Sequence, residues 1–201
     1  ADLDERIHDY LDQSNVLNLS QCGYRRKRNL NEHLITLLEF LKHCRGRNLP
    51  AWIAFVDIRK AFDGIKHSTI MKALQKIGIS SDTRFYKYIM HMYSSLSFSV
   101  KVGSSYSTVE KQLVGIKQGC PLSPILFNIV FDQILKNIIR PWESEVKPLT
   151  YDSMFNVDHG VTGYADDAAL MANERNQLIT FIKNMIDLMA TYGMEMNIGK
   201  T

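Results

Sequence analysis

VTGYADDAALMA, residues 161–172, is the stretch that decides the fold, because two apolar runs flank two adjacent acidic residues in it. Residues 161–165 and 168–172 each have the length and composition of a strand. A two-residue connection between strands is typical of a β-hairpin, so we predict a hairpin with Asp166 and Asp167 as its turn. Acidic pairs are common in turns for conformational reasons alone, and the pair by itself indicates no more than a turn.

Asp57 is a third carboxylate in a notable position, since it directly follows the apolar run of residues 51–56. Such a run is typical of a buried strand. A carboxylate at the end of a buried strand is unfavourable unless it binds a metal or pairs with a basic side chain, for which Arg59 or Lys60 is available. If Asp57 meets the two hairpin carboxylates, hard divalent cations such as Mg²⁺ would relieve their repulsion and would suit phosphoryl transfer.

The rest of the chain predicts an α+β fold in which an antiparallel sheet has helices on one face. Helices are expected at residues 30–41, 67–77, 82–93, 123–139 and 178–189, a second hairpin at 98–102 with 107–113, and a short strand at 194–198. The helix at 123–139 is apolar on nearly every side and is expected to be buried, with Ser123 as its N-cap.

Composition restricts the protein to the globular class. Of its 201 residues, 45% are hydrophobic and 22% are charged, which excludes a disordered or collagen-like chain. Three scattered cysteines offer neither a disulfide framework nor a paired zinc site. The six histidines lack zinc-binding spacing, so surface or capping positions are expected for them. Neither a membrane span nor a signal peptide is recognisable, and we expect a soluble intracellular protein.

Charge is distributed unevenly along the chain. The net charge is only +3, but residues 24–48 hold seven basic side chains against Glu32 and Glu39. Such a run is either a solvated surface or a site for a polyanion, and charge alone does not choose between them.

Five segments together carry a resemblance to a known family. FVDIRKAFDGIKH (55–67), GIKQGCPLSPILFNIVFDQIL (115–135), GYADDAALMA (163–172) and GMEMNIGKT (193–201) occur in the order of polymerase motifs A to D. QCGYRRKRN (21–29) looks like a Q-x-G-F-R-x-x-R fingers block. The chain resembles the reverse transcriptase of non-LTR (LINE-type) retrotransposons, and the Cys and Phe of QGCPLSPILF favour this group over group II intron, retroviral or telomerase relatives.

The resemblance implies a right-hand polymerase, with an antiparallel palm sheet backed by helices. Residues 1–50 would be part of the fingers and 51–201 the palm, with fingers insertions around 68–114. The thumb, and possibly an endonuclease, would be further parts of the same polyprotein. The implied activity is RNA-directed DNA synthesis with two Mg²⁺ or Mn²⁺ ions, an RNA template, a DNA primer or target and dNTPs, in the nucleus and cytoplasm.

The resemblance also implies roles for individual residues. The metal-binding group would consist of Asp57, Asp166 and Asp167, with Val56 and Ile58 contributing through backbone groups. Lys200 matches the lysine proposed to protonate the pyrophosphate leaving group, a general-acid role. The simpler interpretation of Lys200 is a surface lysine near the end of the chain.

The residues implied to bind the nucleotide or the nucleic acid are mostly basic or in motif B. Phe62 would lie under the incoming sugar, although a core aromatic is the simpler interpretation. Gln118 and Gly119 would lie beside the incoming nucleotide. The basic residues divide into Arg25 and Arg28 for the triphosphate, and Arg26, Lys27, Arg45 and Arg47 for nucleic acid.

Two other functions remain open on the sequence. A domain that has kept the fold but lost the chemistry could bind RNA or act as a scaffold in a ribonucleoprotein. An RNA-dependent RNA polymerase is the other alternative, and Phe62 disfavours it because an aromatic ring at that position would exclude a 2′-hydroxyl.

Overall fold

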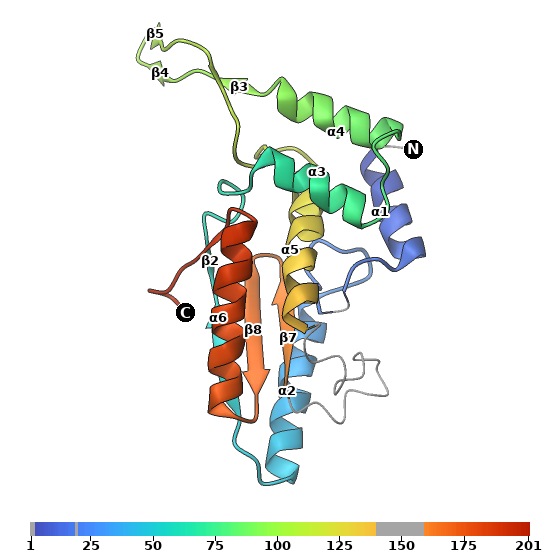
Figure 1. The fold of residues 1–201 in the computed structure, drawn as a ribbon, viewed down its shortest axis with the longest axis vertical. Coiled ribbons are helices and arrows are strands. Elements are labelled where there is room, and N and C mark those ends of the chain that lie inside the picture. Colours follow the sequence, from blue (N-terminus) through green and yellow to red (C-terminus); the bar gives the residue numbers. More distant parts are fainter. Residues whose placement is uncertain (1–2, 19, 140–158) are drawn as a thin grey trace.

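A three-stranded antiparallel sheet forms the centre of the computed structural model, which describes residues 3–18, 20–139 and 159–201 (Figure 1). Its strands are β1 (Trp52–Val56), β7 (His159–Tyr164) and β8 (Asp167–Ala172). The order is β1-β8-β7, so that the hairpin strand β8 is central. The α+β class is therefore confirmed.

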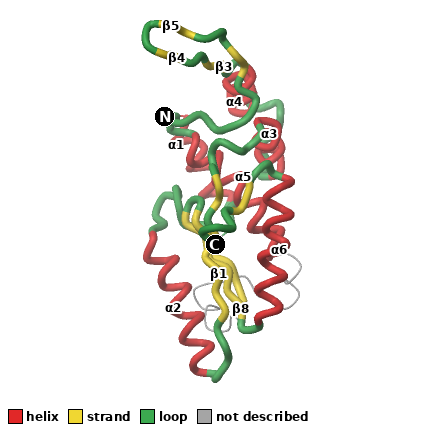
Figure 2. The backbone as a smooth tube through the Cα atoms, turned by 90° about the vertical axis from the view of Figure 1, so that its left-hand side faces the viewer, coloured by secondary structure: helices red, strands yellow, loops and turns green. Residues whose placement is uncertain are grey.

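Helices cover both faces of this sheet. Figure 2 shows β1 and β8 between α2 (Leu30–Gly46) on one side and α6 (Arg175–Thr191) on the other. Successive strand residues point to opposite faces, so Leu170 joins the main core while Met171 packs with Phe40 of α2. The expectation of helices on one face only is wrong, because α2 buries a second, smaller cluster on the other.

The helix α5 (Ser123–Ile139) is the centre of the main core. Every side chain from Ile125 to Leu135 is buried, as its apolar composition predicts. Ser123 is not an N-cap before the helix. It is the first helical residue, and its hydroxyl donates a hydrogen bond to the carbonyl oxygen of Lys117.

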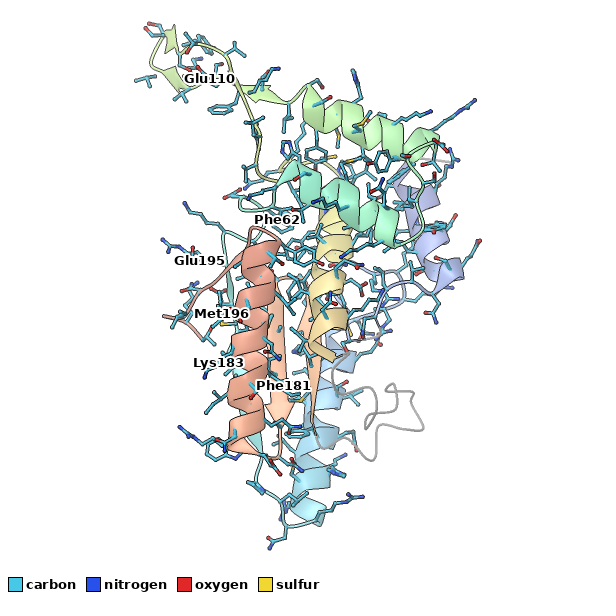
Figure 3. The ribbon with its side chains drawn as sticks, viewed as in Figure 1. Phe62, Glu110, Phe181, Lys183, Glu195 and Met196 are labelled. Carbon is cyan, nitrogen blue, oxygen red and sulfur yellow. The ribbon has the colours of Figure 1, made fainter. Side chains whose placement is uncertain are left out.

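The remaining helices gather at one end of the molecule, together with a hairpin that projects from it (Figure 1). The helices are α1 (Leu3–Ser14), α3 (His67–Lys76) and α4 (Arg84–Ser94). In the projecting hairpin, β3 (Ser97–Phe98) pairs with β6 (Glu110–Lys111), and β4 (Lys101–Val102) pairs with β5 (Ser105–Tyr106). A separate ladder joins β2 (Ile58–Arg59) to β9 (Glu195–Met196), whose residues are labelled in Figure 3.

The predicted elements are found, but some bounds differ. The helix expected at 30–41 continues to Gly46, the helix expected at 178–189 begins at Arg175, and the second hairpin consists of two short ladders rather than strands at 98–102 and 107–113. Burial also differs. The run of residues 51–56 was expected to be a buried strand, but β1 is an edge strand, and Phe55 keeps 60% of its surface exposed. Within the described part of the chain, no helix has the length and apolarity needed to cross a membrane.

Candidate active site

The three predicted metal-binding carboxylates lie at one end of the sheet. Val56, the last residue of β1, pairs with Ala168, the second residue of β8, so Asp57 follows β1 beside the start of β8. The pKa of Asp167 is raised by burial and then by the negative charges of Asp166 and Asp57. The structure thus brings together the carboxylates that the sequence could only place on separate strands.

The hairpin turn differs by one residue from the prediction. Tyr164 pairs with Asp167, so the two turn residues are Ala165 and Asp166, and Asp167 begins β8. Ala165 has a φ of +59°, in the left-handed region. This conformation costs an alanine on the order of 1 kcal/mol, and it persists only where neighbouring groups fix it.

Two residues from the fingers block fix that turn. The amide of Ala165 donates to Oε1 of Gln21 at 3.1 Å, and Nε2 of Gln21 donates to the carbonyl oxygen of Ala165 at 3.0 Å. A Cβ atom on Gly23 would lie 2.1 Å from the amide nitrogen of Ala165, so only glycine fits there. Both residues belong to the quoted block at 21–29, but sequence reasoning assigned neither a role at the site.

Asp57 is held by residues that follow β9. Its Oδ2 accepts a hydrogen bond from Nδ2 of Asn197 at 2.7 Å and lies 3.6 Å from Nζ of Lys200. The amide of Asn197 also donates to the carbonyl oxygen of Asp57 at 2.9 Å. Lys200 is therefore at the site rather than isolated near the end of the chain. Asn197 was missed, and only its place in the GMEMNIGKT segment could have indicated it.

Arg59 does not neutralise Asp57. Its guanidinium lies 3.5 Å from Glu195 across the β2–β9 ladder. The two neighbours of Asp57, Val56 and Ile58, are both buried, and each pairs with a strand partner, so they support the position of Asp57 from either side.

Asp57, Asp166 and Asp167 are chemically suitable ligands for a hard divalent cation, although their side chains are not arranged around one. Among the described residues, no three acidic, histidine or cysteine side chains already form a metal-binding cluster. Asp57 instead faces Lys200 and Asn197. Carboxylates are nevertheless the oxygen ligands that Mg²⁺ prefers. Burial and then the charges of Asp166 and Asp57 raise the pKa of Asp167, and a cation would relieve the repulsion among the three groups.

Phe62 lies at the border of the core, near the ends of α5 and α6 (Figure 3). Its half-buried ring stacks on Phe127 with a centroid separation of 4.9 Å, and Phe127 stacks in turn on Phe131 at 5.6 Å. The ring is thus fixed from one side by the core.

The motif B residues are exposed and tied to the segment after Asp57. Nε2 of Gln118 donates to Oδ1 of Asp63 at 3.1 Å. Gly119 has a φ of +78° and open space where a Cβ would be. The contact places Gln118 beside the Phe62–Asp63 segment, as a site shared by motifs A and B requires.

The fingers arginines make contacts within the protein. Nη1 of Arg25 donates to the carbonyl oxygens of Asn18, at 2.9 Å, and Gln21, at 3.2 Å, and burial lowers the pKa of Arg25. Arg28 pairs with Glu32 at 2.5 Å. Both arginines are therefore already bonded to nearby groups of the protein.

The predicted nucleic-acid-binding residues do not form one patch. Arg26 pairs with Asp9 of α1 at 2.9 Å, and Lys27 follows it in an exposed turn. Arg45 and Arg47 lie at the C-terminal end of α2, which Figure 1 shows at the opposite end of the sheet from the turn between β7 and β8.

One histidine differs from the expectation of surface or capping positions. His33 of α2 is buried, and its Nδ1 is 3.0 Å from Oγ1 of Thr162 in β7. Burial lowers the pKa of His33, and the charge of Asp167 opposes that effect. His33 therefore supports the hairpin from the α2 side.

Comparisons with known proteins agree with this arrangement. Residues 2–201 match the family described as reverse transcriptase (RNA-dependent DNA polymerase). The chain is 30% identical over 161 residues to the Pol polyprotein from type-2 retrotransposable element R2DM of Drosophila melanogaster, covering 80% of this chain and 14% of that protein. It is 29% identical over 186 residues to the Pol polyprotein from type-1 retrotransposable element R2 of Popillia japonica, covering 92% of this chain and 25% of that protein.

Solved structures with the same fold are found among telomerases. The Candida tropicalis telomerase in complex with a TWJ fragment of telomeric RNA has a TM-score of 0.70 at 16% identity, covering 98% of this chain and 32% of that one. The apo form truncated from the C-terminal domain has a TM-score of 0.68 at 17% identity, covering 98% of this chain and 38% of that one. The chain thus spans a minor part of each protein that it resembles.

Proposed function

Because the chain belongs to the reverse transcriptase family, with non-LTR retrotransposon proteins among its relatives, we propose that it is the fingers–palm core of an RNA-directed DNA polymerase. The observation that carries the proposal is the meeting of Asp57 with Asp166 and Asp167 at one end of the sheet. The substrates would be dNTPs, a DNA primer or target and an RNA template. The cofactors would be two Mg²⁺ or Mn²⁺ ions.

The carboxylates would hold the metal ions at the end of the sheet. When bound, two such ions activate the attacking hydroxyl and stabilise the leaving oxygens of an in-line displacement. Asp57, Asp166 and Asp167 would supply the ligands. To do so, Asp57 would turn from Lys200, whose ammonium would then be free to face the pyrophosphate and to act as a general acid.

The remaining residues would bind and select the nucleotide. Gln118 and Gly119 would lie beside the base, and the ring of Phe62 beneath the sugar. The stack of Phe62 on Phe127 supports this role, because a ring fixed from behind can exclude a 2′-hydroxyl sterically. Arg25 and Arg28 would have to exchange their internal partners for phosphate oxygens.

The other lobes would come from outside residues 1–201. The chain covers 14% and 25% of the two R2 proteins compared above, so a thumb, and possibly an endonuclease, would belong to other parts of such a protein. Synthesis of the protein in the cytoplasm and copying of RNA into DNA at a chromosomal target would place it in both cytoplasm and nucleus.

One observation favours a second function, a domain that keeps the fold and binds RNA without catalysis. Asp57 is paired with Lys200, and the described residues hold no preformed metal cluster. The two functions differ in whether the carboxylates bind metal, and one experiment separates them.

Primer extension by the complete protein tests the proposal directly. We expect Asp166→Asn to abolish nucleotide addition, because it removes a charge that the metals require, while Asp82→Asn, an exposed aspartate before α4, remains active. The unsubstituted protein should also gain thermal stability with millimolar Mn²⁺, and Asp166→Asn should not. Extension by Asp166→Asn with Mg²⁺ would refute the metal assignment. An inactive wild-type protein with no metal-induced stabilisation would support the scaffold.

A further inference from the structure

Gln21 has a completely buried side chain whose polar atoms both bond to the backbone of the carboxylate-bearing turn. Oε1 accepts from the amides of Ala165, at 3.1 Å, and Gly23, at 3.0 Å, and Nε2 donates to the carbonyl oxygen of Ala165 at 3.0 Å. The carboxamide therefore acts on Ala165 as a neighbouring peptide group in a sheet would. Glutamine suits this task because one planar group carries both a donor and acceptor positions, whereas an ionised glutamate has no donor.

The backbone around Gln21 continues the same contact along β7. The amide of Gly163 donates to the carbonyl oxygen of Ser20 at 2.7 Å, and the amide of Cys22 donates to the carbonyl oxygen of Gly163 at 2.9 Å. On the side of α5, Nδ2 of Asn128 donates to the carbonyl oxygen of Gly23 at 2.5 Å. Residues 20–23 are thus a short parallel addition to β7 that ends against the turn.

The same segment leads into the fingers arginines. Nη1 of Arg25 donates to the carbonyl oxygen of Gln21 at 3.2 Å. One short stretch of chain therefore touches the carboxylate-bearing turn through the side chain of Gln21, and touches a candidate phosphate-binding arginine through its carbonyl. A displacement of Gln21 would therefore change both the conformation of the turn and the position of Arg25.

We propose that Gln21 is a positioning residue, which holds Ala165 in its left-handed conformation and thereby sets the direction in which Asp166 leaves the turn. The inference rests on the proposed function, because it concerns the carboxylates that would bind the metals. Without the carboxamide, Ala165 keeps no side-chain partner for its amide and carbonyl groups and can relax to a right-handed φ, which carries the next residue, Asp166, away from its place.

The test uses the complete protein with Gln21→Met, which keeps the size of the side chain and removes both polar atoms. Gln133→Met is the matched control, at another buried glutamine, on α5. We expect Gln21→Met to lower kcat for primer extension roughly 10- to 100-fold with the KM for dNTP nearly unchanged, since small displacements of reacting groups have effects of this size. Gln133→Met should leave kcat unchanged.

Hydrogen exchange supplies a second measurement that needs neither metal nor activity. In the metal-free protein, Gln21→Met should speed exchange of a peptide spanning residues 163–167 at least about tenfold, because the amide of Ala165 loses its acceptor. Peptides from α6 should exchange as before. Gln21→Glu, which keeps an acceptor but loses the donor, should cause a loss of kcat of the same kind, and it replaces Gln21→Met if that variant does not fold.

The outcomes separate this inference from the proposed function. If the unsubstituted protein does not extend primers, the proposed function fails, and the exchange experiment still decides whether Gln21 holds the turn. If the unsubstituted protein is active and the folded Gln21 variant keeps its kcat, the positioning role is refuted. Unchanged exchange at residues 163–167 in Gln21→Met, which removes the acceptor, or an increase spread evenly over the protein, would refute it as well.

Discussion

Phe62 packs one face of its half-buried ring against the core, and in the proposed function its other face lies beneath the incoming sugar. Its ring stacks on Phe127, which fixes its orientation, and it follows Asp57 by five residues along the chain. Steric exclusion by such a ring differs from recognition by hydrogen bonding, because a smaller side chain admits the wrong substrate without destroying the site for the right one.

Phe62→Val is therefore expected to increase incorporation of rNTPs relative to dNTPs by about tenfold or more, equivalent to a loss of about 1.4 kcal/mol of selectivity. The ratio of kcat/KM for the two nucleotides measures it. Phe127→Leu is the control, since it weakens the same aromatic stack without shortening residue 62. If Phe62→Val lowers use of both nucleotides equally, or unfolds the protein, Phe62 is a core residue only.

Asp167 makes the metal-free protein sensitive to pH. Burial and the neighbouring Asp166 and Asp57 raise its pKa, so the folded state binds its proton more tightly than the unfolded state does. The stability that this protonation contributes is present below the unfolded pKa and is lost as pH rises through the folded pKa.

Asp167→Asn should consequently raise the Tm of the metal-free protein at pH 7. The rise should be only on the order of 1–2 °C, because the residue as a whole is exposed, its carboxyl group is only partly buried, and solvent screens its neighbours. The gain should be smaller near pH 4, where more of the wild-type carboxyl is protonated than at pH 7. Calorimetry at the two pH values checks this, and equal Tm values at pH 7 would contradict it.

At the scale of elements, residues 20–23 pack so closely on the β7–β8 hairpin that no side chain fits at Gly23. Gly23→Ala should lower the free energy of unfolding by about 2–4 kcal/mol, because the new Cβ meets backbone that has little room to move. Gly46→Ala at the end of α2 is the control, where a Cβ meets nothing within 4 Å and stability should change by less than about 1 kcal/mol. Equal denaturation midpoints for the two variants would refute the close packing.

The hairpin shows how far the sequence could be interpreted. Its existence followed from two apolar runs around acidic residues, but its register did not, since either Ala165–Asp166 or Asp166–Asp167 can be the turn in that pattern. What decides between them is the contact of Ala165 with Gln21, from a distant part of the chain. A pattern within the hairpin contains no information on that contact.

The sequence also could not predict which face of α2 is buried. Its leucines at helical spacing predicted the helix, yet Leu34 and Leu38 are exposed, while His33, Phe40 and Cys44 are buried. The buried face is the one that complements the sheet, where Met171 and Thr162 lie. For the site, motif order predicted the three carboxylates, but their support by Gln21 and Asn197 depends on contacts between distant segments.

At the scale of the whole molecule, the basic residues are dispersed. Arg25, Arg26 and Arg28 contact groups of the protein, and Arg45 and Arg47 lie at the far end of α2. Residues 1–201 on their own should therefore bind a primer–template duplex only at micromolar concentration or more weakly, with a slope of log K against log salt of about −3. Fluorescence anisotropy at several salt concentrations measures it. Nanomolar binding that is insensitive to salt would contradict this expectation.

The contact between Gln21 and Ala165 joins residues 144 positions apart. During synthesis on a ribosome, the segment at residues 20–23 emerges before its partner turn, which follows only after α5 and β7 have been made. Until then Gln21 has no turn to hold and Asp57 has no neighbouring carboxylates. Nascent chains that stop short of β8 therefore lack the pairing that brings Asp57 beside Asp166 and Asp167, on which the proposed function depends.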